Sequence, residues 1–443
     1  MQLTFLRILL ACALLGCALT ANAYTLLRGT LENSRIYPGT VHSYSISVPD
    51  GYTGAEPAAL FLAMDGITCN APARLDSLIA DGHMPFTIGV YLQPGVVLEE
   101  NGEVIRYNRS NEFDATDDLF ATFIETELLP AVTNTRLDDG QPINISSDPA
   151  HRAIFGLSSG GIAALNAAWQ RPDLFGRVYS GCGTFVPMRG GHDLEAIIRK
   201  HEPKPLKIYI QDGYSDTWNP TFGSWYEHNV LVASALEFAG YDCEFDWTES
   251  GHSFARTNVI FDDMMKWLWD GDVSVGTTSN NTLAPILEGC SNQWQSTSPV
   301  EVAASMEQTI PYPDNRLAAI RQINDGHIDQ CIIQQGKPVN CQRFYWPHSY
   351  NNNDIDLGGM AFDSKGLLWA VTDSGIQIFD QNGRVRAIIE LPLEIKKDHN
   401  AADFGILIED GAITLSDGKK AYRRNFNVLP PVPGTTPASQ GAA

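Results

Sequence analysis

Positive charge is scarce in this sequence: 30 lysines and arginines stand against 52 aspartates and glutamates, which gives a formal net charge of −22. The basic residues form no cluster anywhere along the chain. Binding to nucleic acid or to anionic lipid needs grouped lysines and arginines that neutralise phosphates. We therefore expect no nucleic-acid partner, and the acidic charge also disfavours strongly anionic polymers as substrates.

The chain also lacks an apolar run long enough to span a bilayer, which takes about 20 residues. One shorter run, residues 8–19, follows Arg7 and precedes the triplet Ala21-Asn22-Ala23. This order is typical of a cleavable secretion signal. We predict a signal peptide over residues 1–23 and a secreted or periplasmic protein without a membrane span. A lipoprotein anchored through Cys17 is the minor alternative.

Closely spaced metal-binding cysteines are missing as well, because no CxxC motif and no cysteine–histidine spacing suited to zinc occurs. We therefore expect no structural zinc site. Loss of the signal would remove two of the eight cysteines and leave six, namely Cys69, Cys182, Cys243, Cys290, Cys331 and Cys341. An even number in an exported chain predicts disulfides, although six cysteines allow many pairings. Cys331 and Cys341 are close enough to close a local loop.

The organisation of residues 24–271 predicts an α/β domain. Short apolar runs alternate with longer helical patterns, as in a mainly parallel sheet covered by helices. Strands are predicted at residues 58–64, 86–92, 152–155, 177–180 and 206–211. Helices are predicted at residues 114–132, 159–170, 226–238 and 258–269. Two runs that alternate polar and apolar residues, 24–31 and 41–48, predict antiparallel edge strands.

The rest of the chain predicts a smaller second domain, which a length of 443 residues allows. Residues 272–353 are rich in serine, threonine, asparagine and glutamine, and we interpret them as a polar connector pinned by disulfides. Residues 354–429 show an all-β pattern. The proline- and glycine-rich residues 430–443 predict a disordered tail.

The strongest chemical signal is Gly156-Leu157-Ser158-Ser159-Gly160-Gly161, between a strand pattern and an alanine-rich helical pattern. A serine in such a turn stands clear of the sheet at the helix N-terminus, and the glycines allow the backbone to crowd. A glycine-rich turn that only packs a helix is the structural alternative. The strand–turn–helix context favours Ser158 as a catalytic nucleophile.

A nucleophilic serine needs a base and an acid, which follow it in the order acid and then histidine in this type of fold. His252 lies in Glu249-Ser250-Gly251-His252-Ser253, a predicted loop before the last helix of the domain, and is the predicted general base. The acid belongs in the loop after the preceding strand. Asp212 and Asp216 both lie there. Asp216, further into the loop, is preferred, and Asp212 stays open as the alternative.

Acyl transfer also needs donors for the developing oxyanion. One is the backbone NH of Ser159, directly after the nucleophile. The second is expected from the loop Asp65-Gly66-Ile67-Thr68, where Ile67 is the preferred donor and Gly66 the next. A simple turn is the alternative for this loop. This chemistry requires no cofactor and no metal.

With Arg109-Ser110-Asn111-Glu112-Phe113-Asp114 and Glu127-Leu128-Leu129-Pro130, these motifs give residues 24–269 a resemblance to the Putative esterase family. That family includes feruloyl esterases, enterochelin esterases, S-formylglutathione hydrolase and mycolyltransferases. The resemblance implies an α/β-hydrolase fold and carboxylic-ester hydrolysis. It also implies that the second aspartate of the acid-bearing loop serves the triad, which supports Asp216. It specifies no substrate.

Residues 354–429 are similar to gluconolactonase-type β-propeller repeats, in Gly359-Met360-Ala361-Phe362-Asp363, Gly366-Leu367-Leu368-Trp369-Ala370-Val371 and Ile389-Glu390-Leu391-Pro392. The segment holds about two blades, whereas a closed propeller needs about four or more. Gly358 stands where that family presents a metal-binding aspartate. We therefore predict a small, partial propeller-like appendage that packs on the esterase domain or mediates assembly, without a metal site.

The sequence as a whole predicts a secreted serine esterase that acts on aryl or carbohydrate esters through Ser158, His252 and Asp216. An acyltransferase with the same triad is one alternative, and a sugar lactone hydrolase is another. A non-catalytic carbohydrate-binding protein is the third, suggested by aromatic residues such as Trp218 and Trp225 near the presumed site. The acyl and alcohol parts of the substrate and the oligomeric state stay open.

Overall fold

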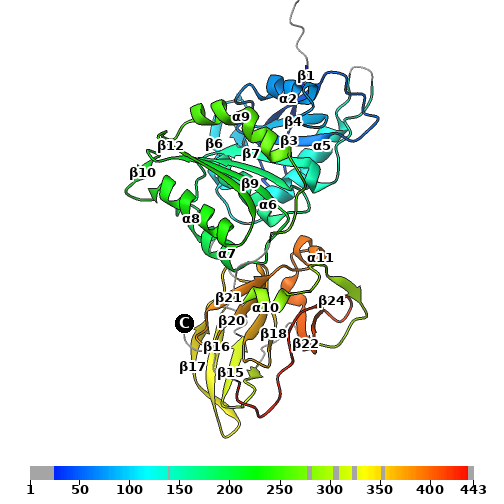
Figure 1. The fold of residues 1–443 in the computed structure, drawn as a ribbon. Helices are drawn as coiled ribbons and strands as arrows, with labels where there is room; N and C mark the ends of the chain where they lie inside the picture. Colours follow the sequence, from blue (N-terminus) through cyan, green and yellow to red (C-terminus); the bar gives the residue numbers. More distant parts are fainter. Residues whose placement is uncertain are drawn as a thin grey trace, which may run out of the picture.

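The structure, a computed structural model, describes residues 24–137, 140–276, 282–302, 309–321, 327–350 and 355–437. Figure 1 shows two bodies: an α/β body in blue to green, and a β-rich body in yellow to red. The predicted signal peptide, with Cys17, lies outside the described residues. None of the described helices combines the length and the apolar character needed to cross a bilayer.

An eight-stranded sheet forms the centre of the α/β body, in the order β1-β2-β4-β3-β7-β8-β9-β12. Its strands are β1 (Tyr24–Leu31), β2 (His42–Pro49), β3 (Ala59–Met64), β4 (Thr87–Leu92), β7 (Arg152–Leu157), β8 (Arg177–Gly181), β9 (Lys207–Gly213) and β12 (Asp242–Thr248). β2 runs antiparallel to both β1 and β4. Every other neighbouring pair is parallel. The predicted α/β-hydrolase fold is confirmed.

Helices cover both faces of this sheet (Figure 1). They are α2 (Ala71–Ala80), α3 (Arg109–Phe113), α4 (Leu119–Phe123), α5 (Leu129–Asn134), α6 (Ser159–Gln170), α7 (Leu194–Lys200), α8 (Trp225–Phe238) and α9 (Phe254–Trp269). The helix predicted over residues 114–132 instead begins at Leu119 and contains a π-helical turn, Ile124–Leu128. Pro130 has no NH and its ring clashes with a carbonyl in the preceding turn, so the wider turn before it relieves that contact. Two short hairpins complete the body: β5 (Val96–Leu98) with β6 (Val104–Tyr107), and β10 (Trp218–Asn219) with β11 (Gly223–Ser224).

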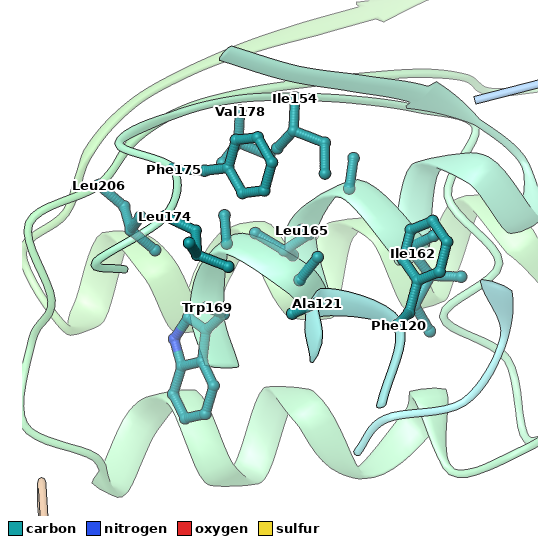
Figure 2. Close-up of a cluster of buried hydrophobic side chains, with 14 of the residues drawn as sticks. Phe120, Ala121, Ile154, Ile162, Leu165, Trp169, Leu174, Phe175, Val178 and Leu206 are labelled. Carbon is teal, nitrogen blue, oxygen red and sulfur yellow. The ribbon is translucent and has the colours of Figure 1, made fainter. Parts of the chain in front are cut away.

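The helix that follows the nucleophile turn is buried on every side. All residues of α6 are buried, and most of them are small or apolar. A helix of this kind belongs in a core rather than on a surface. Figure 2 shows its side chains between the sheet and α4. The labelled residues are Phe120, Ala121, Ile154, Ile162, Leu165, Trp169, Leu174, Phe175, Val178 and Leu206. The packing fixes the end of α6 that carries Ser158.

The β-rich body contains three four-stranded antiparallel sheets. The first has β14 (Thr309–Pro311), β15 (Leu317–Arg321), β16 (Ile328–Gln334) and β17 (Lys337–Tyr345), and the second has β18 (Leu357–Phe362), β19 (Leu368–Thr372), β20 (Gly375–Phe379) and β21 (Val385–Ile389). The third has β22 (Gly405–Glu409), β23 (Ala412–Ser416), β24 (Ala421–Asn425) and the distant β13 (Gln295–Thr297). Two short helices, α10 (Leu283–Leu287) and α11 (Leu393–Lys397), accompany them.

Residues 354–429 hold strands of two sheets, β18 to β21 and β22 to β24, as expected, but the β-rich body begins earlier in the chain. The stretch interpreted as a polar connector supplies β13 to β17, a full sheet and one strand of another. The sequence signal was weak because most of β17 is exposed and polar, so it shows no apolar alternation. The proposed domain boundaries stay predictions. Residues 430–437 contain no helix or strand, and the rest of the predicted tail lies outside the described residues.

One disulfide is present, and it joins the neighbouring strands β16 and β17 through Cys331 and Cys341. The local loop suggested by the sequence is confirmed. The four other described cysteines are free thiols, so the even count overestimated the number of bridges. Cys290, which follows α10, is one of these free thiols, so it forms no disulfide in the predicted connector.

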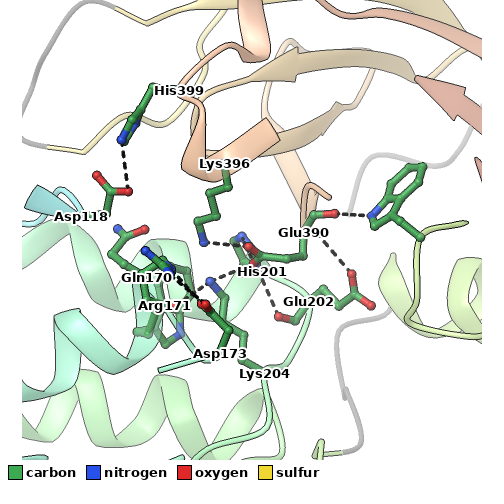
Figure 3. Close-up of polar contacts among 12 residues, drawn as sticks. Asp118, Gln170, Arg171, Asp173, His201, Glu202, Lys204, Glu390, Lys396 and His399 are labelled. Carbon is green, nitrogen blue, oxygen red and sulfur yellow. Dashed lines mark hydrogen bonds and ion pairs between the residues drawn. The ribbon is translucent and has the colours of Figure 1, made fainter. Parts of the chain in front are cut away.

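The two bodies pack together through buried charges, drawn in Figure 3. Glu390 of the β-rich body lies 2.8 Å from the Nζ atom of Lys204, which is almost fully buried in the α/β body. Its other oxygen accepts a hydrogen bond of 2.7 Å from Lys396. A second pair joins Arg424 to Glu202 through two hydrogen bonds of 2.5 and 2.8 Å. The Glu202 NH also donates to the carbonyl of Ile388. The β-rich body is thus attached to the α/β body at defined points.

Candidate active site

Ser158 occupies a strained turn between β7 and α6. Its φ of 59° and ψ of −124° are rare for a residue with a side chain. The turn is held by hydrogen bonds from the Ser158 NH to Gly181 and from the Thr184 NH to the Ser158 carbonyl, at 2.9 and 3.1 Å. A Cβ atom at Gly156 would overlap the carbonyl of Gly160, so only glycine allows this close approach. The geometry is that of a nucleophile elbow.

His252 lies in the loop between β12 and α9, beside the serine. Its Nε2 atom is 2.9 Å from the Oγ of Ser158, and its Nδ1 atom is 2.8 Å from Oδ1 of Asp216. The following residue, Ser253, caps α9 by accepting a hydrogen bond from the Ala255 NH. This cap fixes the chain direction directly after the imidazole. The structure thus brings together the three side chains that the sequence singled out.

Asp216 lies in the loop after β9, with its carboxylate shielded from solvent. Burial alone would raise its pKa, but hydrogen bonds from His252, from Asp212 and from the Thr217 NH together lower the pKa of this carboxyl. A charged carboxylate therefore faces the Nδ1 side of the ring. It fixes the tautomer in which Nε2 can accept a proton from Ser158.

Asp212, the alternative acid, lies behind Asp216 at the end of β9. Its Oδ1 atom accepts a 2.7 Å hydrogen bond from the Gly213 NH, and the hydrogen bond of His252 goes to Asp216 instead. Burial and the neighbouring Asp216 raise the pKa of Asp212. The Oδ2 atoms of Asp212 and Asp216 are both buried, and no other described group donates a hydrogen bond to either of them. A proton on Asp212 could form a hydrogen bond between the two carboxyl groups and so satisfy both oxygens. This arrangement favours Asp216 as the triad acid.

The loop after β3 holds the predicted oxyanion donors. The Gly66 NH donates to the carbonyl of Leu92 at 3.0 Å, so it is not available to a substrate. Among the described residues, the NH groups of Ile67 and Ser159 donate to no protein acceptor. Both groups are therefore available to bind a developing oxyanion, and the preference for Ile67 over Gly66 stays a prediction.

One side chain beside the nucleophile, Thr184, was not predicted. Its Oγ1 atom lies 3.5 Å from Oγ of Ser158 and accepts a 3.3 Å hydrogen bond from the indole of Trp225, an aromatic residue that the sequence had placed near the site. The Trp225 ring also lies edge-on to the His252 ring, 6.3 Å between centroids. Thr184 comes just after β8, the neighbour of β7. Because Ser158 and Thr184 both follow neighbouring parallel strands, the sequence could have predicted that Thr184 lies near Ser158.

One group near the triad has the composition of a metal site: Cys182, Asp216 and His252 have potential ligand atoms within 4.8 Å of one another. A metal would need the thiolate form of cysteine. Burial and the nearby Asp212 raise the pKa of Cys182 to about 12, which keeps the thiol protonated. Asp216 and His252 are already bonded to each other. The donor set therefore fits a hydrogen-bonded histidine–aspartate pair better than a metal.

A family model described as Putative esterase matches residues 39–268, slightly more than half of the chain. The chain belongs to the Putative esterase family. It is accordingly a carboxylic ester hydrolase, and the matched residues contain every predicted site residue. The family match ends before the β-rich body, so the resemblance of that body to gluconolactonase-type repeats is not shown.

Part of this member of the Putative esterase family is similar to several solved esterase structures. A ferulic acid esterase is 18% identical, with 55% of this chain and 97% of that chain covered and a TM-score of 0.42. The enterobactin esterase of Shigella flexneri is 20% identical, with 56% and 60% covered and a TM-score of 0.43. The feruloyl esterase module of Clostridium thermocellum is 15% identical, with 56% and 89% covered and a TM-score of 0.39. No curated protein matches.

Proposed function

We propose that this protein is an exported serine esterase that works through an acyl-enzyme, with Ser158 as nucleophile, His252 as general base and Asp216 as the orienting acid. The observation that carries the proposal is the continuous chain of two hydrogen bonds, 2.9 Å from Ser158 to His252 and 2.8 Å from His252 to Asp216. Nucleophile, base and orienting group within hydrogen-bond reach define this chemistry. Export rests on the signal-like residues 1–23.

Each step follows from this geometry. The Oγ of Ser158 attacks the ester carbonyl carbon while its proton passes to Nε2 of His252. The negative charge on the carbonyl oxygen is stabilised by the NH groups of Ile67 and Ser159. Collapse expels the alcohol, which takes the proton from His252 and leaves an acyl group on Ser158. Water then attacks with the same base, and release of the acid restores the serine.

The surroundings of the triad support aryl or carbohydrate esters as substrates. Ile67, Trp218 and Phe254 are large apolar residues with 43%, 70% and 48% of their surface exposed. Ile67 is the proposed oxyanion residue, Trp218 lies two positions after Asp216, and Phe254 lies two positions after His252. An exposed indole can stack on an aryl ring or on the apolar face of a sugar. The His252 side chain is one-third exposed, so water can reach an acyl-enzyme, which favours hydrolysis over acyl transfer.

The lactonase alternative finds no support in the β-rich body. A Cβ atom at Gly358 would lie 2.6 Å from the carbonyl oxygens of both Ala401 and Phe404. An aspartate therefore does not fit there without a backbone shift. Family membership also sets aside the non-catalytic alternative.

Hydrolysis of p-nitrophenyl acetate and butyrate by residues 24–443, with and without EDTA, tests the proposal. We expect both esters to be hydrolysed at rates that EDTA leaves unchanged, because the proposed steps involve no metal. A feruloyl ester and an acetylated sugar, assayed beside them, would identify the acyl preference. An inert protein, or activity that EDTA abolishes, would refute the serine mechanism.

The two aspartates behind His252 give a matched pair of variants. We expect Asp216→Asn to lower kcat by about 10³- to 10⁴-fold, because the amide no longer holds the productive tautomer. Asp212→Asn is expected to stay within about 10-fold of the parent, since an amide NH replaces the proton of a neutral carboxyl. Steady-state kinetics on p-nitrophenyl butyrate decide the matter. Equal losses in the two variants would contradict the choice of Asp216.

A further inference from the structure

A two-point ion pair holds the loop that carries the Ile67 NH. Arg109 donates from Nε and Nη2 to the two carboxylate oxygens of Asp65, at 2.7 and 2.8 Å. Asp65 follows β3 directly and has a φ of 62°, in the left-handed region that residues with side chains rarely adopt. A conformation of this kind persists only where surrounding contacts impose it. The guanidinium is one of those contacts.

The Asp65 carboxylate also lies against the helix of the nucleophile. Its Oδ2 atom would be 3.1 Å from a Cβ atom at Gly160, in the first turn of α6. On the other side of the loop, the Asp65 carbonyl accepts a 3.3 Å hydrogen bond from Gln93. The ion pair therefore sits where the oxyanion loop meets the turn that follows Ser158.

The chain on either side of Arg109 is held by a buried network that no catalytic step uses. Asn108, the residue before it, donates a 2.7 Å hydrogen bond to Glu112. The carboxylate of Glu112 is fully buried, and it also accepts from the Gly95 NH at 3.0 Å and lies 3.0 Å from Nε2 of His42. These contacts tie the start of α3 to the end of β4 and to β2. Arg109 thus extends from a rigid base toward Asp65.

We propose that Arg109 is a positioning residue for the oxyanion hole: its two-point contact fixes Asp65, and through Asp65 it fixes the NH of Ile67. The inference rests on the proposed serine mechanism. A planar guanidinium can hold both carboxylate oxygens in one geometry, whereas an ammonium acts as a point charge. Lysine at this position would keep the charge and lose the geometry.

The expected signature is a loss confined to the transition state. The oxyanion exists only once the serine has attacked, so a displaced donor lowers kcat and leaves KM nearly unchanged. Removal of one oxyanion donor costs about 10²- to 10³-fold in kcat. Displacement of the Ile67 NH rather than its removal is expected to cost about 10- to 100-fold.

The test compares Arg109→Lys and Arg109→Met with matched variants of Arg74. Arg74 forms a 2.7 Å ion pair with Asp262 and lies over the Phe261 ring, as Arg109 lies over Phe113, but its ion pair joins α2 to α9 and does not involve Asp65. The readouts are kcat, KM and the inhibition constant of an aryl trifluoromethyl ketone, which forms a tetrahedral oxyanion adduct with serine. Thermal melts check folding, and Arg109→Lys carries the test if the methionine variant does not fold.

We expect both Arg109 variants to lose kcat and ketone affinity by the same factor, with KM within about 3-fold of the parent. The Arg74 variants are expected to match the parent. Arg109 variants with parental kcat, or with losses in KM alone, would overturn the positioning role while the parent remains an active esterase. An inert parent would instead refute the proposed function itself.

Discussion

Replacement of Ser158 by alanine is expected to lower kcat/KM for p-nitrophenyl butyrate by about 10⁴-fold or more. The variant loses the atom that forms the acyl-enzyme, whereas the oxyanion donors and the binding surface remain. The residual rate should therefore stay measurable above that of water. The backbone of the turn is set by the packing of α6, so the thermal melting of the variant should match that of the parent. Stopped-flow release of p-nitrophenol gives both the burst and the steady-state rate.

Ser77→Ala is the matched control for this variant. Ser77 is an exposed serine of α2 whose hydroxyl donates to the Ala73 carbonyl within its own helix. Its loss should change neither the burst nor the steady-state rate. If Ser158→Ala hydrolysed the ester at the parental rate, the nucleophile would have to be another residue, and the lactonase alternative would be open again.

Replacement of Glu390 by glutamine is expected to lower the free energy of unfolding by about 2–4 kcal/mol, because breaking a buried ion pair leaves its partner charge uncompensated. The partner is Lys204, whose side chain is only 3% exposed. Burial lowers the pKa of Lys204 to about 7 even though Glu390 raises it, so the ammonium depends on this carboxylate. The lost stability should mainly weaken the contact between the β-rich body and the α/β body. Denaturant unfolding, followed by tryptophan fluorescence, measures it.

Two further variants make this prediction specific. In Lys204→Met with Glu390→Leu, apolar side chains replace the pair, and most of the lost stability should return. Asp398→Asn removes an exposed pair with Lys420 and should change stability by about 0.5 kcal/mol or less. Equal effects of Glu390→Gln and Asp398→Asn would mean that the buried cluster contributes no more than a surface pair.

Much of the α/β body was predictable because its signals are local. Each predicted strand of the parallel sheet is a short apolar run, and the observed strands begin and end within about two residues of the prediction. The predicted helix 159–170 coincides with α6. The β-rich body was harder, since β13 joins β24 across more than a hundred residues, and no local pattern encodes that pairing. Free cysteines on separate elements likewise show why an even count does not determine pairings.

The candidate site likewise contains residues that the sequence could predict and residues that it could not. Ser158 and His252 could be selected because glycine turns and chain order identify them, and the loop context favoured Asp216 over Asp212. The contacts of Thr184 and Arg109 depend on which loops meet at the sheet edge. Arg109 reaches Asp65 across 44 positions of sequence. Such contacts are set by the fold and not by the spacing of residues in the chain.

Covalent labelling with a fluorophosphonate, followed by peptide mass spectrometry, tests the central claim most directly. The reagent reacts much faster with a serine that an adjacent base has activated than with other side chains. The account predicts a single modified peptide that contains Ser158 in the parent, and a label that is greatly slowed in His252→Ala. A parent protein that stays unlabelled while it hydrolyses esters, or a label on another residue, would contradict the assignment of Ser158 as the nucleophile.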